Sequence, residues 1–147
     1  MNKEYEIVPH TADLKIYAYG ITLTEVFRNA LRGMFASIKP QSTHIRYEHD
    51  ELKVSTYTSE RKVVVHSPDR ETLLVDFLSE ALYLSDIHNE AFLDARFSDF
   101  SDTELEAVLF GVAITGFEVV EIKAVTYHDL TFEHLDGIWR ATIVFDI

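Results

Sequence analysis

Apolar residues recur every three or four positions in two stretches of the chain, and this spacing predicts two helices with one buried face each. The first helix is expected over residues 21–38. Thr22 can cap its start, Glu25 follows three residues later, and Pro40 lies just past its end. Its apolar stripe consists of Leu23, Val26, Phe27, Ala30, Leu31, Met34, Phe35 and Ile38.

The second helix is expected over residues 68–85, with Ser67 as its N-cap and Pro68 at the first helical position. Its apolar stripe consists of Leu74, Phe77, Leu78, Ala81 and Leu82. Because each helix has one apolar face, we expect both to cover one side of a sheet.

Alternating apolar and polar residues elsewhere predict strands, beginning with Leu14, Ile16 and Ala18. Three hairpins are expected: residues 46–57 with 61–66 through Ser59-Glu60, residues 90–97 with 104–112, and residues 119–132 with 138–147 through Asp136-Gly137. This order of elements predicts one domain over residues 1–147 with an α+β fold. We expect a two-layer sandwich of mixed, largely antiparallel sheets and two amphipathic helices.

Charge and composition exclude several classes of protein. The chain has 13 Lys plus Arg against 25 Asp plus Glu, a formal net charge of −12. Because this negative charge repels phosphate backbones, we expect no direct, tight binding to nucleic acid. The absence of cysteine excludes disulfides and cysteine-based metal sites. Without an apolar run of membrane-spanning length or a leader pattern, we expect no membrane association and a cytoplasmic location.

The end of the last predicted strand is a candidate metal site. Phe145-Asp146-Ile147 places a main-chain carboxylate beside the Asp146 side chain. Neighbouring carboxylates repel each other unless a cation, a basic side chain or a proton lies between them. Such oxygen ligands suit Ca²⁺ or Mg²⁺, and Asp13 is a candidate further ligand. The alternatives at this point are a solvated terminus and, for Asp13, an Asx-turn after His10-Thr11.

Lys123 is the other candidate functional residue, in a late strand on the face of Glu121, Val125 and Tyr127. Its default role is that of a solvated or Glu-paired lysine. The seven histidines form no metal-binding motif, and the five scattered glycines form no phosphate-binding loop. Sequence signals for an enzyme are therefore weak.

At these same positions the sequence resembles the archease family. The resemblance rests on His10-Thr11-Ala12-Asp13, Tyr19-Gly20 before an amphipathic helix, a Leu-rich second helix, Lys123-Ala124-Val125-Thr126-Tyr127, and the final Asp146-Ile147. These motifs follow the family order over essentially the whole chain. Residues 111–116 depart from the pattern because they lack a polar, Gly-Glu-rich stretch. The departure concerns the local loop and any partner contact there, and none of the site residues.

The resemblance implies a non-enzymatic accessory protein of the RtcB-type RNA ligase of tRNA splicing. That ligase joins RNA ends through a histidine–guanylate intermediate, and archease promotes its guanylylation and multiple turnover. The resemblance also implies a divalent cation, calcium in preference to magnesium, held by Asp13, Asp146 and the main-chain carboxylate of Ile147. Lys123 and His10 are implied to act in activation. Two other interpretations stay open, a metal-dependent hydrolase using the same acids and a general chaperone without metal chemistry.

Overall fold

The computed structural model describes residues 3–8 and 13–147, which form two helices and twelve strands. In chain order these are β1 (Tyr5–Val8), β2 (Leu14–Gly20), α1 (Leu23–Ser37), β3 (Pro40–Gln41), β4 (Ile45–Glu48), β5 (Glu51–Val54), β6 (Ser59–His66), α2 (Arg70–His88), β7 (Glu90–Phe100), β8 (Glu104–Ala113), β9 (Gly116–Phe117), β10 (Ala124–Val125), β11 (Thr131–Leu135) and β12 (Ile138–Asp146). All strand pairings in the described part of the chain are antiparallel. The predicted α+β class is confirmed.

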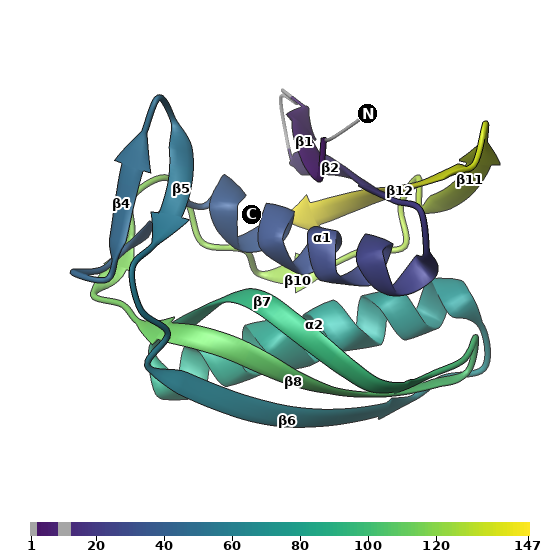
Figure 1. Ribbon diagram of the computed structural model, residues 1–147. Coiled ribbons are helices and arrows are strands. Elements are labelled where there is room, and N and C mark those ends of the chain that lie inside the picture. The colour runs from purple at the N-terminus through teal and green to yellow at the C-terminus, as the bar shows by residue number, and fades with distance from the viewer. Residues whose placement is uncertain (1–2, 9–12) are drawn as a thin grey trace.

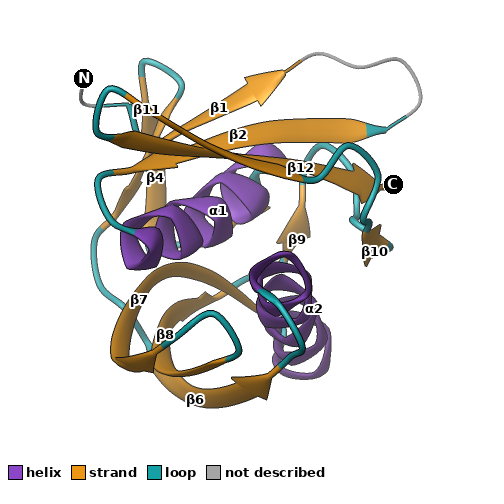
Figure 2. Cartoon of the chain, turned by 90° about the vertical axis from the view of Figure 1, so that its right-hand side faces the viewer, coloured by secondary structure: helices purple, strands orange, loops and turns teal. Residues whose placement is uncertain are grey.

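Helix α1 lies between two sheets (Figures 1 and 2). One sheet has the order β1-β2-β12-β10, with β11 also paired to β12, and the other has the order β6-β8-β7. Helix α2 packs beside α1 and contacts β6, β7 and β10. We expected both helices on one side of a sheet, but most of the α1 surface after Val26 is buried, and this requires cover on two sides.

The start of α1 is held by two reciprocal hydrogen bonds, as the sequence predicts. Glu25 N donates to Thr22 Oγ1 and Ile21 N donates to Glu25 Oε2, each over 3.2 Å. Gly20 lets β2 turn directly into this helix, because a Cβ there would lie 2.8 Å from Thr22 O and Val26 N. The connection is therefore specified by local chemistry.

The predicted N-cap of the second helix is wrong. Asp69, and not Ser67, caps α2, with the Thr72 N–H donating to Asp69 Oδ1 over 2.8 Å. Ser67 instead donates its hydroxyl to Asp76 Oδ2 over 2.6 Å. The helix also extends beyond residue 85 to His88, where Asn89 ends it in the left-handed conformation at φ 54°.

The Asp69 cap predicts a pH-dependent contribution to stability. Hydrogen bonds from the Thr72 side chain and then its N–H lower the pKa of Asp69 below its ordinary 3.8. A lowered folded-state pKa stabilises the fold fully above that ordinary value, and the contribution is lost as pH falls through the folded pKa. Asp69→Ala should therefore lower Tm at pH 7, with a smaller difference from wild type below pH 3.8.

Thermal melting of the wild type, Asp69→Ala and Asp69→Asn at a series of pH values checks this expectation. Asp69→Asn is the matched control because its amide oxygen can accept the same bond without titrating. It should melt near wild type at pH 7 and retain its cap in acid. An Asp69→Ala deficit that is the same at pH 7 and pH 3 would contradict the assignment.

The first predicted hairpin is also wrong. Strand β4 pairs with β5 through His49 and Asp50, both at positive φ (54° and 64°), while β6 pairs with β8. The sequence offers no glycine at this tight turn, so the usual hairpin signal is missing. The second predicted hairpin is confirmed as β7–β8.

The third hairpin is confirmed at its turn and wrong in its first strand. Strands β11 and β12 pair through Asp136-Gly137, at φ 55° and 78°. The expected strand over residues 119–132 contains only β10 and the first residues of β11. A turn interrupts it, where Leu130 N donates to Tyr127 O over 3.3 Å and Asp129 has φ 54°. Strand β12 therefore pairs with β11 along its first half and with β10 at its end.

Candidate functional site

Four predicted site residues lie in the described part of the chain and come together at the end of β12, near the C-terminus (Figure 2): Asp13, Lys123, Asp146 and Ile147. On one side, Leu14 of β2 pairs with Phe145, so Asp13 and Asp146 each directly adjoin this pair at the same end of the two strands. On the other side, Ala124 of β10 pairs with Asp146, and Lys123 N donates to Asp146 O over 2.8 Å. Residues more than one hundred positions apart in the sequence thus meet at one corner of the sheet.

Burial at this corner changes sharply along β12. Phe145 is fully buried, whereas Asp146 is exposed and Ile147 is 39% exposed. Asp13 is half-buried and Lys123 is exposed. Among residues 3–8 and 13–147, neither the Asp146 carboxylate nor the Lys123 ammonium makes an ion pair. The buried Phe145 fixes the end of the strand, and the Asp146 and Lys123 side chains next to it are exposed.

The donor set at this corner has the chemistry of a hard-cation site. Its groups are carboxylates and main-chain oxygens, which Ca²⁺ and Mg²⁺ prefer. In the described part of the chain, no cluster of three or more His, Asp or Glu side chains is arranged to hold a metal ion. The predicted set is of a different kind, because it combines two side chains with a main-chain carboxylate. His10 lies outside the described residues.

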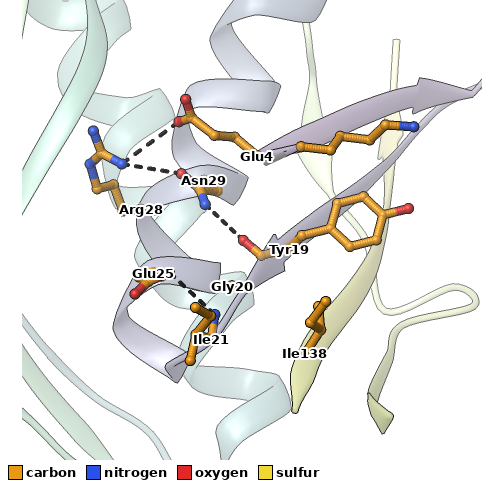
Figure 3. A pocket seen from close by; sticks show the side chains of 9 residues that line it. Glu4, Tyr19, Gly20, Ile21, Glu25, Arg28, Asn29 and Ile138 are labelled. Carbon is orange, nitrogen blue, oxygen red and sulfur yellow. Dashed lines mark hydrogen bonds and ion pairs between the residues drawn. The ribbon is translucent and has the colours of Figure 1, made fainter. Parts of the chain in front are cut away.

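A pocket of about 350 Å³ lies at the opposite end of β2 (Figure 3). Asn29, almost fully buried, donates to Tyr19 O over 2.7 Å, and Glu25 accepts from Ile21 N. The Arg28 guanidinium is bound to Asp94 at 2.5 Å and lies 3.6 Å from Glu4. These polar groups secure the turn from β2 into α1, so we assign the pocket a structural role.

Tyr19 lies at the edge of this pocket, and its hydroxyl donates to Glu6 Oε1 over 3.2 Å. Burial, and then the adjacent Glu6 carboxylate, raises the pKa of the Tyr19 phenol above its ordinary value. The phenol therefore stays protonated at neutral pH and acts as a hydrogen-bond donor.

Local sequence patterns do not predict the groove beside Lys123. It lies between α2 and residues 121–125, with Leu82, Tyr83 and Asp86 contributed by the helix. The groove forms where α2 packs against β10. Local sequence patterns do not predict that these two elements are in contact. Tyr83 is exposed on this helix, but a single surface aromatic is common on folded domains and does not indicate a groove.

Comparison with known proteins decides the family. The model of the archease protein family (MTH1598/TM1083) matches residues 5–147. The chain is 41% identical to the protein archease of Methanosarcina mazei, with 99% of this chain and 97% of that protein covered. It belongs to the archease family. Identity to the archease of Pyrococcus furiosus is 35%, over 99% of both chains.

Solved structures of similar proteins agree with the archease fold described above. The solution structure of Methanobacterium thermoautotrophicum protein 1598 has a TM-score of 0.69 at 30% identity, covering 98% of this chain and 99% of that one. The crystal structure of a Thermotoga maritima archease, described as a possible chaperone, has a TM-score of 0.61 at 23% identity, covering 95% and 94%. In the described part of this archease, neither helix is long and apolar enough to cross a membrane.

Proposed function

We propose that this archease is a non-enzymatic activator of an RtcB-type RNA ligase in the cytoplasm, promoting its guanylylation and multiple turnover during tRNA splicing. Membership of the archease family supports this role. The net charge of −12 supports a protein partner in place of RNA as the direct ligand, because RNA-binding enzymes present basic surface.

The observation that carries the proposal is the convergence at the end of β12. Asp13, Lys123 and Asp146 come from three separate segments, and strand pairing brings those segments to one corner. A corner with the exposed Asp146 carboxylate and the exposed Lys123 ammonium can reach into the mouth of a partner's active site, whereas a buried site could not.

In the proposed mechanism, Asp13, Asp146 and the Ile147 main-chain carboxylate hold a divalent cation, calcium in preference to magnesium. When bound, the cation supplies a positive charge that stabilises phosphate oxygens during guanylate transfer. The Lys123 ammonium, carried beside Asp146 by β10, offsets the negative charge of the acids or contacts a nucleotide phosphate directly. Phe145 is fully buried, and its packing in the core fixes the position of the strand end that carries the acids.

Guanylate transfer to a purified RtcB-type ligase from the same source tests the proposal. Wild-type protein should increase the rate and the number of guanylylation cycles. Asp146→Ala should reduce that stimulation by about tenfold or more, because loss of a ligand weakens cation binding strongly. Glu60→Ala is the matched control, since Glu60 is an exposed strand acid on β6 without an ion pair among the described residues.

The outcomes separate the competing functions. No stimulation by the wild-type protein would refute activation, and cation-dependent hydrolysis would then be measured in its place. Stimulation that Asp146→Ala and Asp13→Ala leave intact would refute the acid site and favour a chaperone role for the same protein.

A further inference from the structure

A groove lies between α2 and residues 121–125 and ends beside Lys123. It consists of two adjoining hollows of about 510 and 140 Å³, which share Leu82, Asp86, Glu121 and Ile122. We call it the α2 groove. Leu82 and Ile122 in its lining are partly exposed, and Tyr83 at its margin is 59% exposed. An aromatic side chain beside partly exposed aliphatic side chains gives the groove an apolar contact area, and aromatic residues are enriched at protein interfaces.

Two acidic side chains occur in both hollows of this groove. Asp86 comes from α2 and Glu121 from the segment before β10. Among residues 3–8 and 13–147, neither carboxylate has a hydrogen-bond or ion-pair partner, although most basic side chains of the described chain do. The groove therefore combines apolar contact area with two carboxylates that outweigh the single Lys123 ammonium at its end, and this negative balance complements a segment with an apolar side chain flanked by Lys or Arg.

The groove is also continuous with the corner at the end of β12. Lys123, Ala124 and Val125 line it, and the same residues connect to Asp146 through β10. Strand β10 is the outer strand of its sheet, and Figure 2 shows it with the C-terminus on the α2 side of the molecule. A segment bound in the groove would thus lie next to the proposed activating residues.

We propose that the α2 groove binds a basic segment of the partner ligase, one that carries an apolar side chain between Lys or Arg residues. This inference rests on the proposed function, because it names the surface by which the activator docks. A second copy of this chain would bring another net charge of −12 to an acidic groove and is a poorer match. RNA is a poorer match for the same reason.

Titration of the protein against the ligase separates docking from activation. The double variant Asp86→Lys/Glu121→Lys should raise the concentration needed for half-maximal stimulation of guanylylation by about tenfold and leave the plateau unchanged. The difference should shrink at high salt, because exposed charges are screened. Asp146→Ala should show the opposite split, with a lower plateau and a similar half-maximal concentration.

Glu60→Lys/Asp99→Lys is the matched control, since it makes the same charge change at exposed acids of β6 and β7. If both double variants shift the curve equally, net charge and not the groove governs docking, and the inference is wrong. If the wild-type protein does not stimulate the ligase at all, the proposed function is wrong, and so is the docking inference that rests on it. If the wild type stimulates the ligase and the groove variant gives the same titration curve, docking through the α2 groove is refuted and the proposed function is not.

Photo-crosslinking locates the bound segment directly. A benzophenone amino acid at Tyr83 should crosslink to a Lys- or Arg-rich segment of the ligase. The control position is Val64 on β6, which is 57% exposed against 59% for Tyr83. Crosslinking that is equal at the two positions, or confined to Val64, would overturn the assignment. A crosslink from Tyr83 to a second copy of the chain would identify a dimer surface and overturn it as well.

Discussion

Replacement of Phe27 by alanine is expected to lower the free energy of unfolding by about 3–5 kcal/mol. Phe27 is fully buried on α1, and its ring lies 5.9 Å from Phe77, 4.9 Å from Phe100 and 6.3 Å from Phe132 between centroids. These partners belong to α2, β7 and β11, so one ring joins both helices and both main sheets. Its removal leaves a cavity that no single element can close.

The size of the effect follows from two contributions that add at this position. The alanine variant loses the transfer free energy of a large apolar side chain and also creates a cavity. The edge-to-face pair with Phe100, at an interplanar angle of 84°, contributes about 0.5–1.5 kcal/mol beyond burial. Since the total stability of a domain is only about 5–15 kcal/mol, the variant should be close to its folding limit.

Urea unfolding followed by circular dichroism measures this difference. Tyr83→Ala is the matched control, an aromatic-to-alanine change on a helix where the side chain is 59% exposed. It should alter the unfolding free energy by no more than about 0.5 kcal/mol. Equal losses for the two variants would show that Phe27 does not join the layers as the structure indicates.

The sequence predicts those elements whose boundaries are set by neighbouring residues. Helix α1 is predicted correctly because Thr22 and Glu25 provide its cap within four positions. The β11–β12 turn is predicted because Asp136-Gly137 adopts positive φ readily. The β4–β5 turn uses His49 and Asp50 for the same conformation, and these residue types give no comparable signal.

The candidate site, like the fold, is predictable from the sequence only in part. Asp13, Lys123 and Asp146 can be selected from the sequence as chemically unusual positions, but their proximity depends on the register of β2 and β10 against β12. A shift of one residue in either pairing would turn the side chains to the opposite face. Burial of Leu14, Val125 and Phe145 against the core fixes that register. The site is therefore specified by apolar residues that have no part in its chemistry.

Calcium should stabilise the wild-type protein through this same corner. A ligand present at one hundred times its Kd raises the unfolding free energy by about 2.7 kcal/mol if it binds only the folded state. For a chain of this length that corresponds to an increase in Tm of about 5–10 °C. Asp146→Asn should lose most of the increase, since the amide offers one oxygen and no charge.

Without calcium, the Asp146→Asn variant should be at least as stable as the wild-type protein. Asp13 and Asp146 adjoin the Leu14–Phe145 pair at the same end of β2 and β12, and two neighbouring carboxylates repel. Asp146→Asn removes this repulsion, so the variant should melt at or above the wild-type Tm in the presence of a chelator. Asn has nearly the same size and shape as Asp, so the substitution creates no cavity that would offset the gain.

Melting curves with chelator, Ca²⁺ and Mg²⁺ distinguish a specific site from general screening. Glu60→Ala should respond to calcium as the wild type does, because its carboxylate lies on the other main sheet. If Asp146→Asn gains as much from calcium as the wild type, the ion acts by screening the net charge of −12 and the acids form no site. A larger increase in Tm with Mg²⁺ than with Ca²⁺ would support the site but show that it prefers magnesium. A specific site requires stabilisation that is lost with one carboxylate, whereas screening depends only on the total charge.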